Sequence, residues 1–390
     1  MLLPLSVRQE PQKYAPVRTL LLYLTEECNL RCTYCFVKKQ PKFMSRETAL
    51  KTMDYVMQRN ISGGEYSVAV AFFGGEPFLA VERMQEIVDY GQQPRTNVYK
   101  DFDFSATTNC TLANAAVEKV VRQGQMTLLL SVDGGEEASR WRPRVSGRES
   151  YSLVRKNLPR LVSWAQHSTA RVTFTPENLQ LLKSVREVLE LAPIGVALCP
   201  VVEADWSGYE EGLDEAYAEL GDWFLAEIRA GRRPPLEVTW DQLRDYGRRI
   251  HCQRRPDRPC PVGDSLLAVD TQGNVMPCHR FLHRPERLGR VEDGRLPAER
   301  WRYAHLQTLE IPDCEGCVAR TVCAGGCRAV ALGAGLGLEG VHPNHCLLLR
   351  AQMRMVQRVY QEIHSHEFYG RFLSSQPTRG VLGELLKLGS

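Results

Sequence analysis

Between residue 18 and about residue 230, short apolar runs alternate with longer stretches in which apolar residues recur at helical spacing. The apolar runs, each of which predicts a buried strand, are residues 19–24, 66–73, 102–106, 127–132, 170–174 and 196–201. The amphipathic stretches that follow them and predict helices are residues 45–59, 81–90, 114–123, 151–163, 178–191 and 210–229. This alternation predicts an α/β fold in which helices cover a parallel sheet.

Six β–α units fit either an incomplete barrel or an open doubly wound sheet. Both arrangements place functional residues at the carboxyl ends of the strands. We expect a partial, TIM-like (β/α)6 barrel over residues 17–230, preceded by a short lead at residues 1–16. Such a lead is too short to fold as an extra domain.

The character of the sequence changes after Gly231. The segment that opens with "GRRPPLEV" predicts a linker over residues 231–251, and cysteines then dominate residues 252–346. Residues 347–364 predict a helix, and a glycine-punctuated tail completes the segment 347–390. We therefore expect a barrel, a linker, a cysteine-rich domain and a closing helix.

Charge and composition narrow the functional classes. A net charge of +3 gives no reason to expect a nucleic-acid or membrane partner. No signal segment precedes the first strand, and no apolar stretch approaches the roughly 18 residues of a membrane helix. These features predict a cytoplasmic protein. The thirteen cysteines are then expected to bind metal rather than to form disulfides.

Three cysteines, Cys28, Cys32 and Cys35, follow the first predicted strand. Four thiolates would close a structural zinc or iron–sulfur site, whereas three around a [4Fe–4S] cluster leave one iron open for chemistry. A zinc site that takes its fourth ligand from elsewhere is the alternative that the spacing leaves open.

The next three predicted strands also end in polar or glycine-rich segments: "FFGGEP", "SATTNCTL" and "LSVDGG". Gly74 and Gly75 allow the backbone to approach a ligand closely, and Glu76 can accept hydrogen bonds from an ammonium group. Each segment alone is a common turn, but their succession on neighbouring strands predicts one ligand pocket.

With these motifs, residues 18–202 resemble the radical S-adenosylmethionine (SAM) enzymes. The resemblance rests on Cys-x3-Cys-x2-Cys, on the aromatic Tyr34 and on Gly-Gly-Glu at residues 74–76. It implies that SAM binds the open iron of a [4Fe–4S] cluster. The implied SAM contacts are Tyr34, Gly74, Gly75, Glu76, Asn109, Ser131 and Arg142, with Arg144 as a competitor for the last.

The resemblance also implies the reaction. An electron, supplied by a donor such as flavodoxin or ferredoxin, cleaves SAM to methionine and a 5′-deoxyadenosyl radical, which removes hydrogen from a substrate. The protein supplies position, dryness and redox tuning.

The later cysteines resemble the SPASM domain of peptide-modifying radical SAM enzymes, with the pattern C-x12-G-x4-C, then C-x2-C-x5-C-x3-C, then C. The resemblance implies two auxiliary [4Fe–4S] clusters and thus three in total. The implied inner ligands are Cys260, Cys278 and Cys327, and the outer ligands are Cys314, Cys317, Cys323 and Cys346. A zinc ribbon over residues 314–327 is the alternative.

At three positions this chain differs from the radical SAM and SPASM families that it resembles. Fully ligated relatives place a cysteine near Ser265, so the inner cluster either has an open iron or takes Cys252 as a ligand. Relatives that mature sulfatases carry an aspartate where this chain has His279, which can also move a proton. Cys110 stands where glycine is usual; it is either a tolerated small residue or a reactive thiol.

We expect a peptide-modifying enzyme that acts on a ribosomally made precursor and forms a thioether or carbon–carbon crosslink or another modification. The alternatives are an anaerobic sulfatase-maturating enzyme that forms formylglycine and a non-catalytic, metal-stabilised binding module. Because the lead is short, we also expect a precursor to be recognised by a separate leader-binding protein or by the barrel and cysteine-rich domain.

Overall fold

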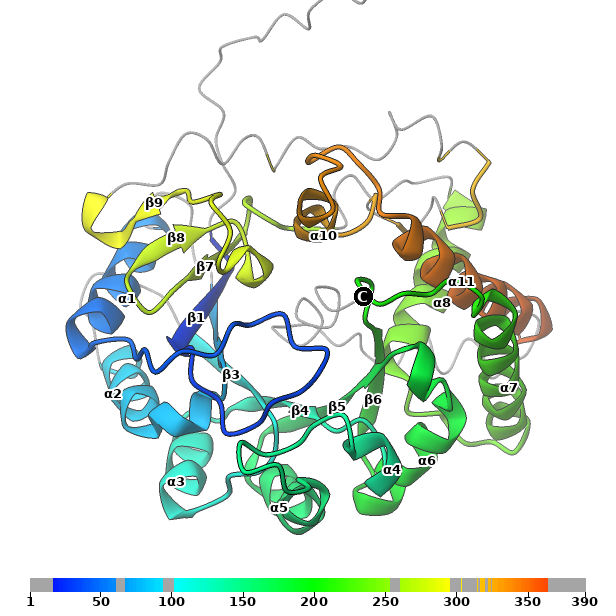
Figure 1. Cartoon of the computed structure of the whole chain (residues 1–390), viewed down its shortest axis with the longest axis horizontal. Helices are drawn as coiled ribbons and strands as arrows, with labels where there is room; N and C mark the ends of the chain where they lie inside the picture. Colours follow the sequence, from blue (N-terminus) through cyan, green and yellow to red (C-terminus); the bar gives the residue numbers. More distant parts are fainter. Residues whose placement is uncertain are drawn as a thin grey trace, which may run out of the picture.

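The computed structural model describes residues 17–60, 67–93, 102–252, 260–294, 303, 314, 316–319, 322, 323 and 325–363. The predicted fold class is confirmed: parallel strands form a partial barrel with helices outside it (Figure 1). The barrel strands are β1 (Thr19–Thr25), β2 (Val68–Gly74), β3 (Phe102–Thr108), β4 (Thr127–Ser131), β5 (His167–Phe174) and β6 (Gly195–Pro200). The predicted lead at residues 1–16 and the tail beyond residue 363 lie outside the described residues.

The helices follow the predicted order. They are α1 (Arg46–Asn60), α2 (Val81–Gly91), α3 (Ala115–Gln123), α4 (Glu136–Ser139), α5 (Tyr151–Trp164), α6 (Leu181–Leu191) and α7 (Glu210–Arg229), with 3-10 turns η2 (Pro77–Ala80) and η3 (Pro176–Asn178). Each longer helix turns an apolar stripe toward the sheet, as Val117, Val120 and Val121 of α3 do. Because the six strands pair in parallel, their carboxyl ends lie at one rim.

The cysteine-rich region extends this sheet, which the sequence did not predict. The strand order is β6-β5-β4-β3-β2-β1-β7-β8-β9. The added strands are β7 (Leu266–Val269), which pairs parallel to β1, and the antiparallel β8 (Asn274–Met276) and β9 (Gly289–Arg290). Asp270 holds the β7–β8 turn, because its carboxylate accepts a hydrogen bond from Asn274 N at 2.9 Å. The 3-10 turns η4 (His279–Phe281) and η5 (Val291–Asp293) follow.

Both faces of β1 are buried, but against different parts of the chain. Leu20 and Leu22 pack in the outer core between the sheet and the helices. Leu21 and Tyr23 face the barrel interior, where they share a cluster with Phe281 and other residues of the cysteine-rich region. The alternation along the strand therefore seats that region against the inside of the barrel.

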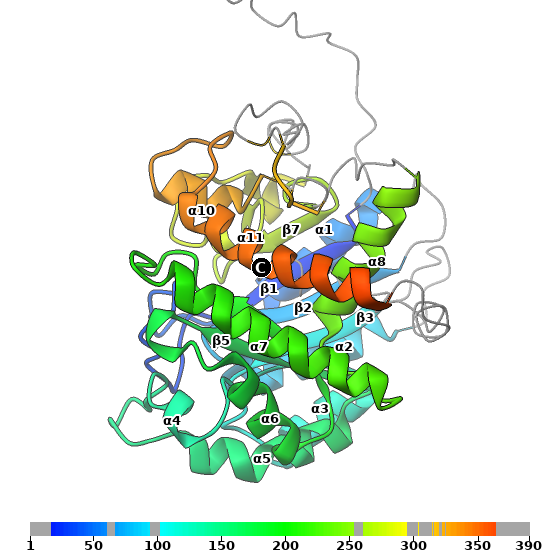
Figure 2. The same cartoon turned by 90° about the vertical axis from the view of Figure 1, so that its right-hand side faces the viewer.

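The expected linker at residues 231–251 is wrong in its second half, because it contains helix α8 (Glu237–Cys252). Helix α11 (Pro343–Ile363), which starts four residues before the predicted helix, packs against both α7 and α8 (Figure 2). Gly221 of α7 permits this approach, since a Cβ there would lie 3.0 Å from Met355 Cγ. The short helix α10 (Arg328–Gly333) precedes α11. Across the described ranges, no helix combines the length and apolar character needed to span a membrane.

Candidate active site

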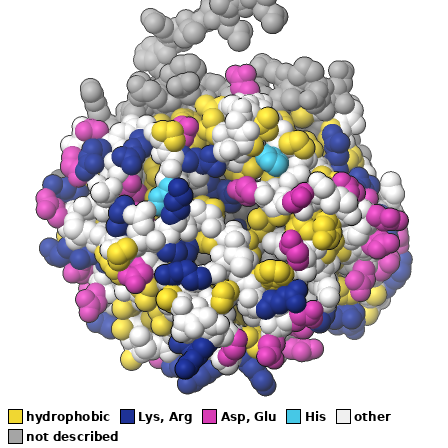
Figure 3. Space-filling view, viewed as in Figure 1, with side chains coloured by type: hydrophobic (Ala, Val, Ile, Leu, Met, Phe, Trp, Pro, Cys, Tyr) yellow, Lys and Arg dark blue, Asp and Glu magenta, His cyan; other side chains and the backbone are white. Residues whose placement is uncertain are grey.

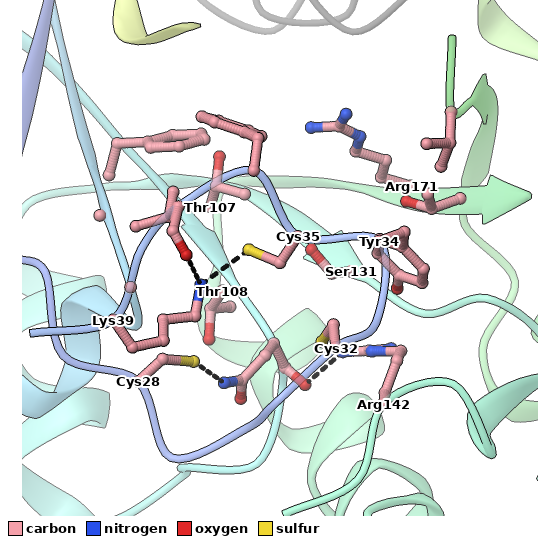
Figure 4. Close-up of a pocket in the computed structure, with 18 of the residues that line it drawn as sticks. Cys28, Cys32, Tyr34, Cys35, Lys39, Thr107, Thr108, Ser131, Arg142 and Arg171 are labelled. Atoms are coloured by element: carbon pink, nitrogen blue, oxygen red, sulfur yellow. Dashed lines mark hydrogen bonds between the residues drawn. The ribbon is translucent and has the colours of Figure 1, made fainter. Parts of the chain in front are cut away.

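A cavity of about 330 Å³ opens at the carboxyl ends of the barrel strands. In the space-filling view this face is hollowed near its centre, with Lys and Arg side chains around the hollow (Figure 3). Nearly all of the barrel residues predicted to bind the cofactor or the first cluster line the cavity: Cys28, Cys32, Tyr34, Cys35, Gly74, Gly75, Asn109, Ser131 and Arg142. Figure 4 shows several of them converging on one space.

The three cysteines lie on the loop between β1 and α1, residues 26–45, which we call the cysteine loop. Its two ends are joined, because Glu26 N donates to Lys42 O at 3.0 Å and Met44 N to Leu24 O at 2.8 Å. Its middle is held by the segment after α4, where Thr33 N donates to Trp141 O at 3.0 Å. Backbone bonds at both ends and in the middle therefore fix the loop over the cavity.

Gly74 and Gly75 bring β2 into direct contact with this loop. Gly75 N donates to Thr25 O at 2.8 Å. A Cβ on Gly74, whose φ is +137°, would lie 2.1 Å from Thr25 O, and a Cβ on Gly75 would lie 1.9 Å from Glu27 O. No side chain fits in that space, so the two glycines allow the cysteine loop to lie against β2, and they also line the cavity.

Glu76 differs from its predicted role as a cofactor ligand. Its side chain is fully buried and does not line the cavity. The carboxylate accepts hydrogen bonds from Asn109 N at 2.7 Å, Thr108 Oγ1 at 2.9 Å and Phe78 N at 3.1 Å. Glu76 therefore ties the end of β3 to the end of β2 and positions Asn109.

Burial raises the pKa of Glu76 to about 7, against its three hydrogen bonds, which lower it. A raised pKa means that the folded state holds the proton more tightly than the unfolded chain. The free energy of unfolding should therefore fall as pH rises from about 4.5 through about 7. Between pH 6 and 8.5 the wild type should lose about 1 kcal/mol relative to Glu76→Gln. Denaturant titrations of the wild type and Glu76→Gln at about pH 6 and 8.5 measure this change in the free energy of unfolding. An equal change in both proteins would contradict the raised pKa of Glu76.

Arg142 and Tyr34 form a buried network with Asp133. The Tyr34 hydroxyl donates to Asp133 Oδ2, and Arg142 Nε lies 3.9 Å from the same oxygen. Arg142 is 1% exposed and donates from Nη2 to Asn109 O at 3.0 Å, while its Nε and Nη1 have no hydrogen-bond partner in the described structure. Burial opposes its charge, but Asp133, Tyr34 and the nearby thiols together outweigh burial and raise the pKa of Arg142. This fixed cation with unused donors lines the cavity, and Arg144 does not.

Asn109 links the third strand to the first cysteine. Its Nδ2 lies 3.6 Å from Cys28 Sγ and donates to Asn29 Oδ1 at 2.9 Å. The next residue, Cys110, has a φ of +66° and is fully buried in the outer core. A positive φ explains why glycine suits this position. Because Cys110 does not line the cavity, the structure lends no support to a reactive role for its thiol.

The three thiols of the cysteine loop suit a multi-iron cluster. Burial raises the pKa of Cys28 and raises that of Cys32 to about 11, so neither is ionised at neutral pH without a bound cation. Within the described ranges, no three His, Cys, Asp or Glu side chains already surround a point for a single metal ion. Thiolates that bind separate irons of a cube need not converge on one point. Together with the unused donors of Arg142, this donor set fits a [4Fe–4S] cluster with SAM.

Within the described residues, the later cysteines have one another as electrostatic neighbours. Burial raises the pKa of Cys260 and of Cys278, and a nearby Cys327 thiolate raises both further. Cys323 has Cys314 and Cys346 as its electrostatic neighbours, and Arg350 hydrogen-bonds to Cys317 beside the same pair. The Cys252 side chain lies outside the described residues. Ser265 joins β1 through its carbonyl oxygen, which accepts from Arg18 N at 2.7 Å.

His279 is buried between the two cysteine regions. Its ring centroid lies 4.8 Å from that of Phe73 and 5.9 Å from that of Phe36. Burial lowers its pKa well below the ordinary value, and Arg280 and Arg171 lower it further. His279 Nδ1 has no hydrogen-bond partner among the described residues. The imidazole is therefore neutral near pH 7, and its lowered pKa makes it a weak proton acceptor.

Sequence reasoning missed four charged residues that line the cavity: Lys39, Arg171, Glu203 and Arg280. Lys39 Nζ lies 2.7 Å from Cys35 Sγ. Arg280 pairs with Glu203, and its guanidinium lies over the Phe36 ring at 4.8 Å. For Arg171 a signal existed, because it is the one Lys, Arg, Asp or Glu within β5.

Comparisons with known proteins agree with this site. The family described as "Radical SAM superfamily" matches residues 22–188. An uncharacterized protein of Methanocaldococcus jannaschii, MJ0907, is 28% identical over 168 residues, which are 43% of this chain and 56% of that protein. A serine-type anaerobic sulfatase-maturating enzyme of Klebsiella pneumoniae is 22% identical over 358 residues, which are 84% of this chain and 85% of that enzyme.

Two kinds of solved structure share the fold. Native anSMEcpe with bound AdoMet and Cp18Cys peptide has a TM-score of 0.71 at 18% identity, over 90% of this chain and 100% of that one. Streptococcus suis SuiB bound to precursor peptide SuiA has a TM-score of 0.57 at 14% identity, over 84% of this chain and 75% of that one. With the family match over residues 22–188 and three thiols on one cavity, the barrel of this chain belongs to the radical SAM superfamily of enzymes.

Proposed function

We propose that this radical SAM enzyme modifies a peptide or protein and that its cysteine-rich region carries two auxiliary [4Fe–4S] clusters. The observation that carries the proposal is the grouping of the later thiols into one set of three and one set of four, beside the cavity of the first three. Seven thiols in two groups exceed what a single zinc ribbon uses. This weighs against a non-catalytic zinc module.

Each residue of the cavity has a proposed task. Cys28, Cys32 and Cys35 would hold the first cluster, and Arg142 would hold the SAM carboxylate with its unused Nε and Nη1. Ser131 would contact the ribose. When bound, the cluster and SAM supply the radical that removes hydrogen from the substrate. The chain itself positions both partners and keeps water away from them.

Sulfatase maturation is the second candidate. It is supported by relatives named as sulfatase-maturating enzymes that match most of this chain. His279 lies beside the cavity at the position where such relatives carry an aspartate, but its lowered pKa makes it a weaker proton acceptor than an ordinary imidazole. A thioether or carbon–carbon crosslink in a precursor peptide is the first candidate, supported by the SPASM-like cysteine pattern and by the fold shared with SuiB.

The test combines metal analysis with turnover. Anaerobic reconstitution should give about twelve irons per chain. Reduced enzyme with SAM should then modify either a short peptide encoded beside the gene or a sulfatase-derived peptide, and mass spectrometry would tell which. An active preparation with only one cluster, or with stoichiometric zinc, would contradict the proposed cluster content.

The role of Cys252 is open to a separate prediction. If the inner cluster has only Cys260, Cys278 and Cys327 as ligands, Cys252→Ala should keep about twelve irons and full turnover. An open iron could then bind a substrate thiolate, which favours a thioether product. Iron analysis and the electron paramagnetic resonance spectrum with a cysteine-bearing peptide measure both points. Loss of about four irons in the variant, with no spectral response to peptide, would assign Cys252 as the ligand.

A further inference from the structure

Arg171 is the one charged residue of β5 that points into the cavity, beside Ser131 of β4 (Figure 4). Its neighbours across the sheet are Ser131 and Ala197, neither of which carries a charge. Its Nη2 lies 2.9 Å from Cys199 Sγ, and its Nε is buried without a hydrogen-bond partner among the described residues. The Asp133 carboxylate interacts electrostatically with Arg171, but it already accepts a hydrogen bond from Tyr34 and pairs with Arg142. A thiol is a weak acceptor, so Arg171 keeps donor capacity for a further anion.

Two of the other three cations that line the cavity form ion pairs within the described structure. Arg142 is paired with Asp133. Arg280 is paired with Glu203, and Lys39 contacts Cys35 Sγ and Val37 O. No carboxylate of the described residues forms an ion pair with Arg171. Arg171 is half-buried, and an anion bound at its guanidinium would offset the cost of that burial.

The two arginines lie on opposite sides of Tyr34 (Figure 4). Arg142 lies on the side of Cys32, where the SAM carboxylate is expected. Arg171 lies on the other side, close enough to His279 to lower the pKa of its imidazole. Thr173 of β5 and Val201, Glu203 and Arg280 also line the cavity. This is the space left for the substrate when Arg142 holds the cofactor.

We propose that Arg171 anchors a carboxylate side chain of the peptide substrate, so that an Asp or Glu near the modified residue determines specificity. The inference rests on the peptide-modifying function proposed above. A guanidinium presents its donors in a planar fork that matches a carboxylate, and charge-assisted hydrogen bonds of this kind are the stronger ones. A neutral amide in the same place would lose the charge and one acceptor oxygen.

Two pools of capped heptapeptides test the proposal. They differ only at the central residue, Glu in one and Gln in the other, with a mixture of neutral residues elsewhere. Reconstituted full-length enzyme with SAM is dialysed anaerobically against each pool, and mass spectrometry measures the peptide retained. The wild type should retain the Glu pool about tenfold more strongly. Arg171→Gln should abolish this preference, and Arg171→Lys should keep part of it.

Arg140→Gln, which removes an exposed arginine outside the cavity, should keep the full preference. Arg171→Glu should instead favour a third pool with central Lys, which guards against a variant that merely misfolds. Equal retention of the Glu and Gln pools by the wild type, including no retention of either, would overturn the proposal. So would a preference that survives Arg171→Gln, or a loss of SAM affinity in Arg171→Gln without any pool preference in the wild type.

Turnover separates this inference from the proposed function. If peptides of both pools are modified equally, the enzyme modifies peptides but Arg171 is not a carboxylate anchor. If the pools and the gene-linked and sulfatase-derived peptides are all left unmodified, the proposed function fails.

Discussion

Cys32→Ala is expected to abolish formation of 5′-deoxyadenosine and to remove about four irons per chain. Cys32 lies between the other two thiols on a loop whose backbone bonds hold it over the cavity, so no other thiol of the loop can replace it. The auxiliary groups have their own seven thiols and should keep their signals. Iron analysis and chromatography of the SAM products measure both effects.

Cys110→Ala is the matched control for that variant. Its thiol is fully buried in the outer core and does not line the cavity, so the full iron content should remain. Product formation by Cys32→Ala at the wild-type rate would remove the case for the cysteine loop as the site of SAM cleavage.

Gly75→Ala is expected to lower the free energy of unfolding by about 3 kcal/mol or more and to weaken binding of the first cluster. The added Cβ would lie 1.9 Å from Glu27 O and 3.0 Å from Cys28 N, so the cysteine loop must move away from β2. Backbone atoms cannot rotate aside as a flexible side chain can. Denaturant titration and iron analysis measure the two consequences.

Gly212→Ala makes the same chemical change without the clash. Gly212 lies in the first turn of α7, where a Cβ would meet only Leu179 Cδ2 at 3.7 Å. Alanine favours a helix over glycine, so this variant should be as stable as the wild type or up to about 1 kcal/mol more stable. If Gly75→Ala proved equally benign, the close contact between β2 and the cysteine loop would not hold in solution.

The barrel was predictable because its signals are local. Each strand is an apolar run followed by a helical pattern, and the two periods differ clearly in sequence. Strand β7 was missed because its four residues, "LLAV", carry no period of their own and sit among cysteines. Helix α8 was missed because the Arg- and Pro-rich start of its segment suggested a linker for the whole.

The cavity residues divide in the same way. Cys28, Cys32 and Cys35 follow from spacing, and Arg142 was suggested only by the resemblance to radical SAM enzymes. The sequence could not show that the Glu76 carboxylate is buried away from the cavity, because its three hydrogen-bond partners come from the end of β3 and the start of η2. Arg171 was missed because its place in the cavity depends on the curvature that brings β5 opposite the cysteine loop.

The most direct test of the central claim, that this radical SAM enzyme acts on a peptide, is the mass of the 5′-deoxyadenosine it forms from SAM with a deuterated peptide. The account predicts that a peptide substrate, either gene-linked or sulfatase-derived, transfers one deuterium to this product. Unlabelled 5′-deoxyadenosine from both deuterated peptides, formed by enzyme with its full complement of iron, would contradict it.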